Sequence, residues 1–256
     1  MFKASPKNIL NYIFQRLPFY LFSVKPAKII LAGGEECIKN HYPTNANTEV
    51  LWAHLLDFDL YLEEKNNPVS ERLIAVFIDE YTPFHPDCIV AGIKPYVAPD
   101  RYYFLLNNFF KLIENKLGLE LVIAAHPRSH YENHPDYFEG RKCIRGQTIK
   151  LIRKSKLVLS HSSTALSFAN LFYKPVVFIT SSELNRSYQG PLIIEMAKLF
   201  GKKPIFIDKN NDIDWKFELI VDNNLYDNYR RGYIKTKHSE NFPFWQIVAN
   251  RLKEEF

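Results

Sequence analysis

The chain has 256 residues, 46% hydrophobic and 15% aromatic, which is enough to bury a core in one large domain or two small ones and excludes an intrinsically disordered chain. Thirty-three Lys and Arg against 28 Asp and Glu give a net charge of +5, a mild basic excess that favours anionic ligands or a membrane surface. Because the basic residues do not cluster and no zinc-knuckle or RNP-like motif occurs, nucleic-acid binding is not expected.

The first predicted element is an apolar segment near the N-terminus, Ile9–Phe22. Arg16 and Pro18 interrupt it, and it falls short of the ~18 apolar residues that a membrane-spanning helix needs. It also lacks the cleavage site of a signal peptide. The favoured interpretation is a helix packed on the core, and the alternative is an interfacial helix that rests on a membrane.

After this segment, short apolar runs alternate with longer helical patterns, which is typical of βα units. Several runs are rich in Val, Ile and Leu without alternation, so both faces of a parallel sheet should be covered. The pattern predicts an α/β fold with a doubly wound, Rossmann-like parallel sheet. Strands are expected at Lys28–Ala32, Val50–His54, Leu73–Ile78, Leu119–Ala125, Leu157–Ser160, Val176–Thr180 and Pro204–Ile207, and helices at Arg101–Leu117, Thr148–Lys154, Thr164–Phe172, Pro191–Phe200 and Phe242–Glu255.

Two connections organise the chain. Residues 63–71 are polar and contain a proline, so we expect a short N-terminal part at residues 1–66 and the main domain at residues 67–256. Tyr81–Asp100 is a long, proline-containing link of the kind that forms lids and binding loops. Its aromatic residues Tyr81, Phe84 and Tyr96 either stack on a sugar or base, or only pin the loop to the domain.

Hydroxyl groups cluster where the strand ending at His161 meets the next helix. Ser162, Ser163 and Thr164 open that helix, and its free backbone N–H groups can bind a phosphate. Ordinary capping is the alternative, but it needs only one such residue.

A histidine and several charged residues follow other strands. His126 ends a buried strand and precedes Pro127, which limits where the imidazole points, so His126 can contact a leaving phosphate or act as a general acid. Asp79 and Glu80 end an earlier strand at the ligand-binding edge of such sheets, where one can act as a base and either can cap a turn. Two further candidates are Glu183, suited to a sugar hydroxyl, and Arg128, suited to phosphate charge.

Other kinds of site lack support. The sequence contains no G-x-G-x-x-G, Walker A or G-x-S-x-G motif, which argues against dinucleotide, P-loop and nucleophile-elbow sites. The D-x-D triplets at residues 57–59 and 212–214 are not adjacent to the Ser and His units, so no metal is expected. Three widely spaced cysteines indicate neither a disulfide framework nor a metal site, which favours the cytoplasm.

Taken together, the order Phe-Ile-Asp79-Glu80, His126-Pro127, Ser162-Ser163-Thr164 resembles the acidic, HP and Ser/Ser-Thr motifs of bacterial sialyltransferases, polysialyltransferases and capsule Kdo transferases. The resemblance covers roughly residues 72–185. It implies the donor-binding half of a GT-B fold and metal-independent, inverting transfer of a sialic acid-like sugar or Kdo from a CMP-sugar. The implied acceptor is a bacterial surface glycan or a lipid-linked glycan, reached in the cytoplasm or peripherally at the inner membrane.

By this resemblance Asp79 or Glu80 is the general base, His126 contacts or protonates the CMP phosphate, and Ser162 and Ser163 hold that phosphate. Tyr81 stands where the family has Gly, which leaves open which carboxylate is the base, and residues 1–66 are short for an acceptor-binding domain. No cofactor is implied beyond the donor. The alternatives are a sugar-nucleotide epimerase and a non-catalytic domain that binds a nucleotide or a partner.

Overall fold

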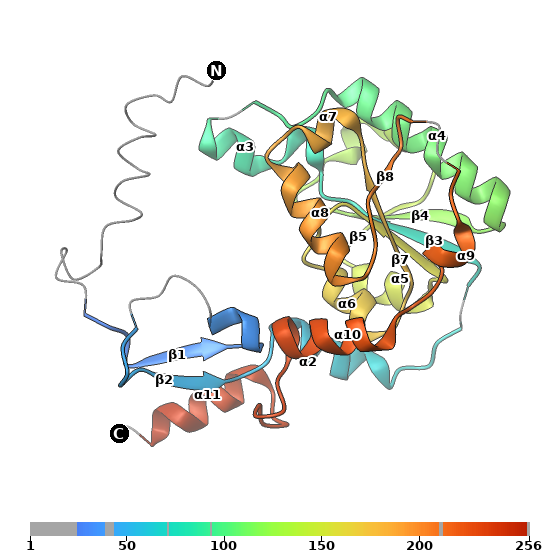
Figure 1. Ribbon diagram of the computed structural model, residues 1–256. Helices are drawn as coiled ribbons and strands as arrows, with labels where there is room; N and C mark the ends of the chain where they lie inside the picture. Colours follow the sequence, from blue (N-terminus) through green and yellow to red (C-terminus); the bar gives the residue numbers. More distant parts are fainter. Residues whose placement is uncertain (1–24, 39–43, 71, 93, 210–211, 255–256) are drawn as a thin grey trace.

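The computed structural model describes residues 25–38, 44–70, 72–92, 94–209 and 212–254, so the predicted helix at Ile9–Phe22 lies outside the described residues. Its centre is a six-stranded parallel sheet in the order β5-β4-β3-β6-β7-β8 (Figure 1). This order confirms the doubly wound, Rossmann-like α/β fold. The strands are β3 (Ile74–Ile78), β4 (Glu120–Ala125), β5 (Cys143–Arg145), β6 (Leu157–Ser160), β7 (Val176–Thr180) and β8 (Ile205–Phe206).

Helices cover both faces of this sheet. On β3, Ala75 and Phe77 belong to a core with α4 (Pro99–Leu117), whereas Val76 and Ile78 face the core on the other side, which includes residues of α5 (Thr148–Lys154), α6 (Leu166–Leu171) and α10 (Asn223–Tyr229). All five residues of β3 are buried. A strand buried on both faces needs apolar residues at every position, which explains the unbroken apolar runs in the sequence.

The helix α4 follows the sequence prediction closely. It begins with Pro99, which suits a first helical turn because proline lacks an N–H to satisfy there. It ends at Gly118, whose φ of +64° is left-handed and whose N–H donates to the carbonyl oxygen of Glu114 at 3.1 Å. Leu106, Phe110 and Ile113 are fully buried, so this face of α4 forms part of the core.

Several short elements differ from the expectations. The strand β5 is not predicted because its three residues, two of them exposed, carry no apolar pattern. The link Tyr81–Asp100 contains η3 (Thr82–Phe84) and α3 (Pro86–Ala91), and α6 begins at Leu166, two residues after the predicted start. The other elements without a sequence prediction are α2 (Leu56–Lys65), α7 (Ser182–Asn185), α9 (Trp215–Glu218), α10 (Asn223–Tyr229), η2 (Glu35–Ile38), η4 (Tyr131–Asn133), η5 (Pro135–Phe138) and the π-helix η6 (Arg230–Ile234). The helix α8 (Gln189–Leu199) begins two residues before its predicted start.

The two ends of the described chain meet in a small unit. The strands β1 (Ile29–Ala32) and β2 (Glu49–Trp52) form a parallel pair, and the C-terminal helix α11 (Phe244–Lys253) lies beside them (Figure 1). Arg251 of α11 donates to Glu49 of β2, with 2.7 Å between Nε and Oε1. Gly34 approaches the backbone of η6 so closely that an added Cβ would lie 2.1 Å from the carbonyl oxygen of Gly232.

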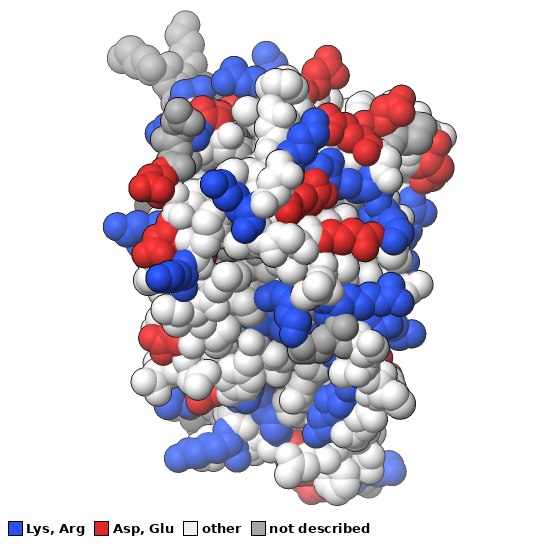
Figure 2. All heavy atoms as spheres, turned by 90° about the vertical axis from the view of Figure 1, so that its right-hand side faces the viewer, with Lys and Arg blue, Asp and Glu red and all other residues white. Residues whose placement is uncertain are grey.

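The surface charge is mixed. Figure 2 shows Lys and Arg side chains interspersed with Asp and Glu side chains on one face of the molecule. Among the helices that the structure describes, none is long and apolar enough to cross a membrane.

Candidate functional site

The order of strands reverses between β3 and β6, which are neighbours in the centre of the sheet. From β3 the chain continues through β4 and β5 to one edge, then returns and continues through β6, β7 and β8 to the other. In open α/β sheets ligands bind at such a switch point, outside the carboxyl ends of the strands. Asp79 and Glu80 follow β3 and Ser162 follows β6 closely, so the tertiary structure brings two of the predicted motifs together here.

Glu80 reaches across the switch point to Ser162. The Ser162 backbone N–H donates to Oε1 of Glu80 at 2.7 Å, and the Ser162 hydroxyl lies 3.5 Å from Oε2. Burial raises the pKa of the Glu80 carboxyl group, while the hydrogen bonds from Ser162 and the backbone of His161 lower it. The Glu80 carboxylate therefore accepts the Ser162 N–H, a donor that the sequence assigns to a phosphate.

Asp79 points the other way and joins β3 to the end of β4. Its Oδ1 accepts the backbone N–H of Tyr81 at 2.9 Å, and its Oδ2 accepts that of His126 at 3.1 Å. Burial raises its pKa to about 6, although these hydrogen bonds favour the charged form. The bond to Tyr81 also supports a non-glycine residue with a left-handed φ of +52°. Both oxygens of Asp79 are thus engaged in holding the backbone.

His126 is half-buried, and its ring has a defined tautomer. The backbone N–H of Arg128 donates to Nδ1 at 3.2 Å, which assigns the ring proton to Nε2. Burial and the neighbouring His85 and Arg128 lower the pKa of His126, so the ring is neutral at pH 7 and Nε2–H is a donor. Tyr81 stacks nearly parallel to the ring, with centroids 6.4 Å apart and 11° between the planes. Because Tyr81 is buried, this stacking agrees with the interpretation in which Tyr81 pins the loop to the domain.

The remaining hydroxyls after β6 have different surroundings. The Ser163 hydroxyl accepts the backbone N–H of Ala165 at 3.3 Å, which is a local cap. The Ser163 backbone N–H donates to the hydroxyl of Ser160 at 3.3 Å, and Thr164 is exposed. Ser162 is thus the member of the cluster that contacts Glu80.

Three other predicted residues lie farther out. Arg128 is exposed and its Nη2 lies 3.3 Å from Oδ1 of Asp87, a surface ion pair. Pro127 is exposed beside it. Glu183, at the start of α7, accepts the backbone N–H of Ala98 at 3.3 Å and so ties the beginning of α4 to the end of β7.

Sequence reasoning missed the role of His161. This residue is fully buried, its Nδ1 lies 2.8 Å from the carbonyl oxygen of Ile179, and its Nε2 lies 2.8 Å from the hydroxyl of Tyr102 on α4. Burial lowers its pKa to about 4. Since the carbonyl can only accept, Nδ1 donates and Nε2 accepts from Tyr102. The sequence signal was its place at a strand end next to Ser162, but the sequence does not say that the ring turns into the core.

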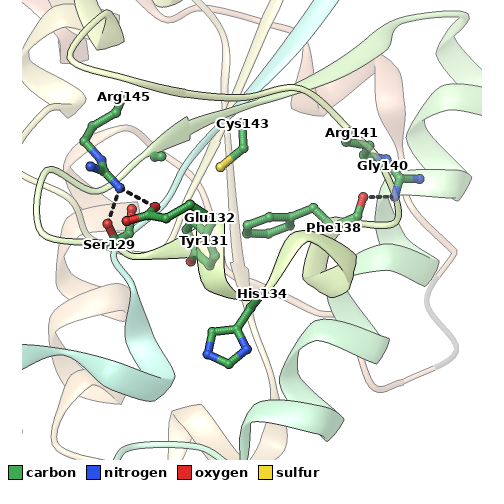
Figure 3. A pocket seen from close by; sticks show the side chains of 10 residues that line it. Ser129, Tyr131, Glu132, His134, Phe138, Gly140, Arg141, Cys143 and Arg145 are labelled. Carbon is green, nitrogen blue, oxygen red and sulfur yellow. Dashed lines mark hydrogen bonds and ion pairs between the residues drawn. The ribbon is translucent and has the colours of Figure 1, made fainter.

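A cavity of about 500 Å³ lies beside the carboxyl ends of β4 and β5, one strand away from Glu80 (Figure 3). Figure 3 shows Arg145 directed at Ser129 and Glu132, with 3.0 Å between Nη2 and Oε2 of Glu132. Arg141 is paired with Glu114 at 2.7 Å. None of the predicted site residues lines this cavity, whose polar and aromatic walls are Ser129, Tyr131, Glu132, His134, Phe138, Arg141, Cys143 and Arg145.

No protein-family model matches the sequence, and no curated protein matches it either. Solved structures that resemble the chain include a protein assigned as a UDP-N-acetylglucosamine 2-epimerase from Listeria monocytogenes, with 12% identity and a TM-score of 0.45 over 80% of this chain and 53% of that one. MnaA from S. aureus in complex with UDP gives 16% identity and a TM-score of 0.44 over 81% and 53%.

A UDP-GlcNAc 2-epimerase from Neisseria meningitidis bound to UDP-GlcNAc gives 15% identity and a TM-score of 0.41 over 81% of this chain and 56% of that one. The chain spans about half the length of the solved structures it matches. The likeness is one of fold alone, to about half of each of these GT-B structures.

Proposed function

We propose that this chain is a nucleotide-sugar-dependent glycosyltransferase whose donor phosphate binds at the switch point between β3 and β6. The observation that carries the proposal is the contact of the Glu80 carboxylate with the Ser162 backbone N–H, 2.7 Å long, at the carboxyl edge of the sheet. An N–H group that binds a carboxylate can bind a phosphate oxygen in the same way. His126, at the end of the neighbouring strand β4, supplies a neutral Nε2–H donor to the same edge.

In this proposal the donor phosphate replaces the Glu80 carboxylate at Ser162. Glu80 is then released as the general base, whereas Asp79 stays bound to the backbone of Tyr81 and His126. This supports Glu80 rather than Asp79 as the base, because Asp79 has both oxygens engaged and Glu80 contacts a group that the phosphate would take over. Burial raises the pKa of Glu80, which makes its carboxylate a stronger base.

The reaction is inverting transfer. The acceptor hydroxyl oxygen forms a bond to the anomeric carbon while its proton passes to Glu80. The bond between the anomeric carbon and the phosphate oxygen breaks, and its electron pair leaves with the nucleotide. The backbone N–H and the hydroxyl of Ser162, together with Nε2–H of His126, stabilise the negative charge that develops on the leaving phosphate.

The motifs favour a CMP-linked sialic acid-like sugar or Kdo as donor and a surface or lipid-linked glycan as acceptor. A nucleoside that extends from the switch point over the end of β4 would meet the cavity of about 500 Å³ beside β5. Its walls include the aromatic rings of Tyr131 and Phe138, which can pack against a base or ribose.

A thermal-shift panel of CMP, UDP, GDP and their sugars tests the site. Ligand at 100 times its Kd stabilises the folded state by about 2.7 kcal/mol, so CMP should raise the melting temperature while UDP and GDP should not. Stabilisation by UDP alone would replace the CMP-sugar assignment by that of another sugar transferase. No stabilisation by any nucleotide would contradict the site.

Activity assays with the stabilising donor test the reaction. His126→Ala and Ser162→Ala should each abolish transfer and keep the fold, which circular dichroism checks. His130→Ala is the matched control, because His130 lies in the same loop but its side chain is exposed and its ring pairs with Glu132 at 3.1 Å. Full activity in both site variants would overturn the assignment. Conversion of the donor without acceptor would indicate an epimerase, and binding without turnover would indicate a non-catalytic domain.

A further inference from the structure

A second cavity, of about 380 Å³, is lined by basic and aromatic side chains. It lies between α2, the end of α6 and the segment around η6. Four of its eight lining residues are cationic, and no Asp or Glu is among the described residues that line it. The eight residues are Phe58, Tyr61, Lys65, Leu171, Arg230, Lys235, Thr236 and Lys237.

Arg230 has buried donors that nothing satisfies within the described part of the chain. Its Nε and Nη2 atoms are buried without a hydrogen-bond partner there. Its guanidinium carbon lies 4.8 Å from the centroid of the Tyr173 ring, and its Nη1 lies 3.9 Å from Oδ1 of Asp227, at the limit of an ion pair. Buried guanidinium donors without acceptors cost free energy, so an anion that accepts from them would be bound favourably.

The other three cations add positive charge that described carboxylates do not neutralise. Lys235 donates to the carbonyl oxygens of Ser239 and Glu240 at 2.8 and 3.1 Å, which are uncharged partners. Lys65 and Lys237 form no ion pair with any residue that the structure describes, and the Lys65 amine lies 5.8 Å from the centroid of the Tyr61 ring. Four positive charges around one cavity repel one another, and a multivalent anion would relieve that repulsion.

The cavity is separate from the switch point. Leu171 is the last residue of α6, which starts after the carboxyl end of β6 and leads back to the amino end of β7. The cavity therefore lies at the amino end of the sheet, whereas Glu80 and Ser162 lie at the carboxyl end.

We infer that the cavity between α2 and η6 is a binding site for a phosphate-bearing ligand, with Arg230 as its central donor and Lys65, Lys235 and Lys237 around it. A phosphate offers several acceptor oxygens and more than one negative charge, which matches buried guanidinium donors and the surrounding amines. Phe58 and Tyr61 supply an apolar wall for the group that carries the phosphate. The ligand is either a soluble phosphate compound or the phosphate headgroup of a lipid.

Two probes distinguish these sources. Isothermal titration calorimetry with inorganic pyrophosphate measures binding of a soluble phosphate. Co-sedimentation with vesicles of equal parts phosphatidylglycerol and phosphatidylcholine, compared with phosphatidylcholine alone, measures binding of a headgroup. The titrations use the full chain and its His126→Ala/Ser162→Ala double variant, which lacks both side-chain donors of the switch point, so that pyrophosphate bound there is recognised by its weaker binding to that variant.

Arg230→Gln should weaken binding of the responding probe by about tenfold or more, because it removes a charged donor. Lys237→Gln should weaken it by a smaller factor, and it alters an exposed side chain, so it keeps the test open if Arg230→Gln fails to fold. The matched control is Arg231→Gln, since Arg231 is the next residue of η6 but is exposed and pairs with Glu35 at 3.4 Å. The affinity of the Arg231→Gln variant for the responding probe should stay within twofold of that of the original chain.

Binding of pyrophosphate that depends on Arg230 and persists in the His126→Ala/Ser162→Ala double variant supports a soluble ligand, and vesicle binding alone with the same dependence supports a lipid headgroup. The inference is overturned if neither probe binds, or if both Arg230→Gln and Lys237→Gln bind as tightly as the original chain.

Discussion

The central sheet and the small unit formed by the chain ends are built in different ways. Every residue of β3, β6 and β7 is buried, whereas of the eight residues in β1 and β2 only Ala32 is. The central sheet can rely on burial of apolar surface from both faces. The small unit relies on a close approach between glycines and on polar contacts such as that between Arg251 and Glu49.

This difference indicates which of the two regions can support a catalytic site. A partly buried contact between Glu80 and Ser162 needs a rigid support, and the two-sided core behind β3 and β6 provides it. The small unit offers no comparable enclosed framework among the described residues. We therefore expect changes at the sheet edge to act on the reaction and changes in the small unit to act on stability.

The largest effect is expected for Glu80→Gln with the donor identified by thermal shift. Gln keeps an oxygen that can accept from Ser162 N–H but cannot take a proton, so kcat should fall by about 10²- to 10⁴-fold. Donor affinity should not fall, because a neutral amide competes less with the donor phosphate for that N–H than a carboxylate does. Steady-state kinetics and donor titration measure the two quantities. An unchanged kcat would exclude Glu80 as the base and remove the chemical contrast between the two regions.

The next effect concerns pH, and it arises from two buried groups of the central sheet. Burial raises the pKa of Asp79 to about 6 from 3.8, so its stabilising contribution is present below pH 3.8 and lost as pH rises through 6. Burial lowers the pKa of His161 to about 4 from 6.5, so its contribution is present above pH 6.5 and lost as pH falls through 4. Between pH 4 and 6.5, therefore, the two groups change the free energy of unfolding in opposite directions as pH rises.

Asp79→Asn should therefore expose the slope of His161. The free energy of unfolding of this variant should rise by up to about 3 kcal/mol as pH rises across that window, because each pKa unit corresponds to about 1.4 kcal/mol. The opposing contribution of Glu80, whose pKa burial also raises, reduces this increment. His161→Gln should show the opposite slope. Urea unfolding at several pH values measures both, and equal slopes in the two variants would contradict the assignment.

A smaller loss is expected in the small unit for Gly34→Ala. The added Cβ would lie 2.1 Å from the backbone oxygen of Gly232, so η2 must move away from η6, at a cost of about 1–3 kcal/mol in the free energy of unfolding. Gly232→Ala is the control, since its Cβ would meet only the flexible Glu36 side chain, at 3.1 Å. Equal stability of the two variants in urea would show that the close approach does not hold the unit together.

The smallest effect is expected for Arg251→Met. The ion pair with Glu49 is partly exposed, so its loss should cost about 0.5–1 kcal/mol, and high salt should reduce the difference. A double-mutant cycle with Glu49→Gln in urea isolates the pair. A coupling energy of several kcal/mol would mean that the polar contacts of the small unit are as strong as the packing of the sheet.

Much of the central sheet could be predicted from local patterns. Unbroken apolar runs indicate strands covered on both faces, and the apolar stripe of α4 with Gly118 after it indicates a helix and its end. Local patterns also place polar residues directly after these strands, namely Asp79, Glu80, His126 and Ser162. The strand β5 could not be found, because three residues with exposed ends carry no periodic signal and form a strand only by pairing with β4.

The sequence by itself determined the α/β class, the parallel sheet and the residue types at its carboxyl edge, since these follow from the spacing of apolar and polar residues along the chain. Only the tertiary structure decided that Glu80 meets Ser162 while Asp79 holds the backbone of His126. Successive residues after a strand point to opposite sides, and which neighbour each one meets depends on the order of strands in the sheet. The same holds for the meeting of the chain ends and for the cationic cavity, which join residues distant in sequence.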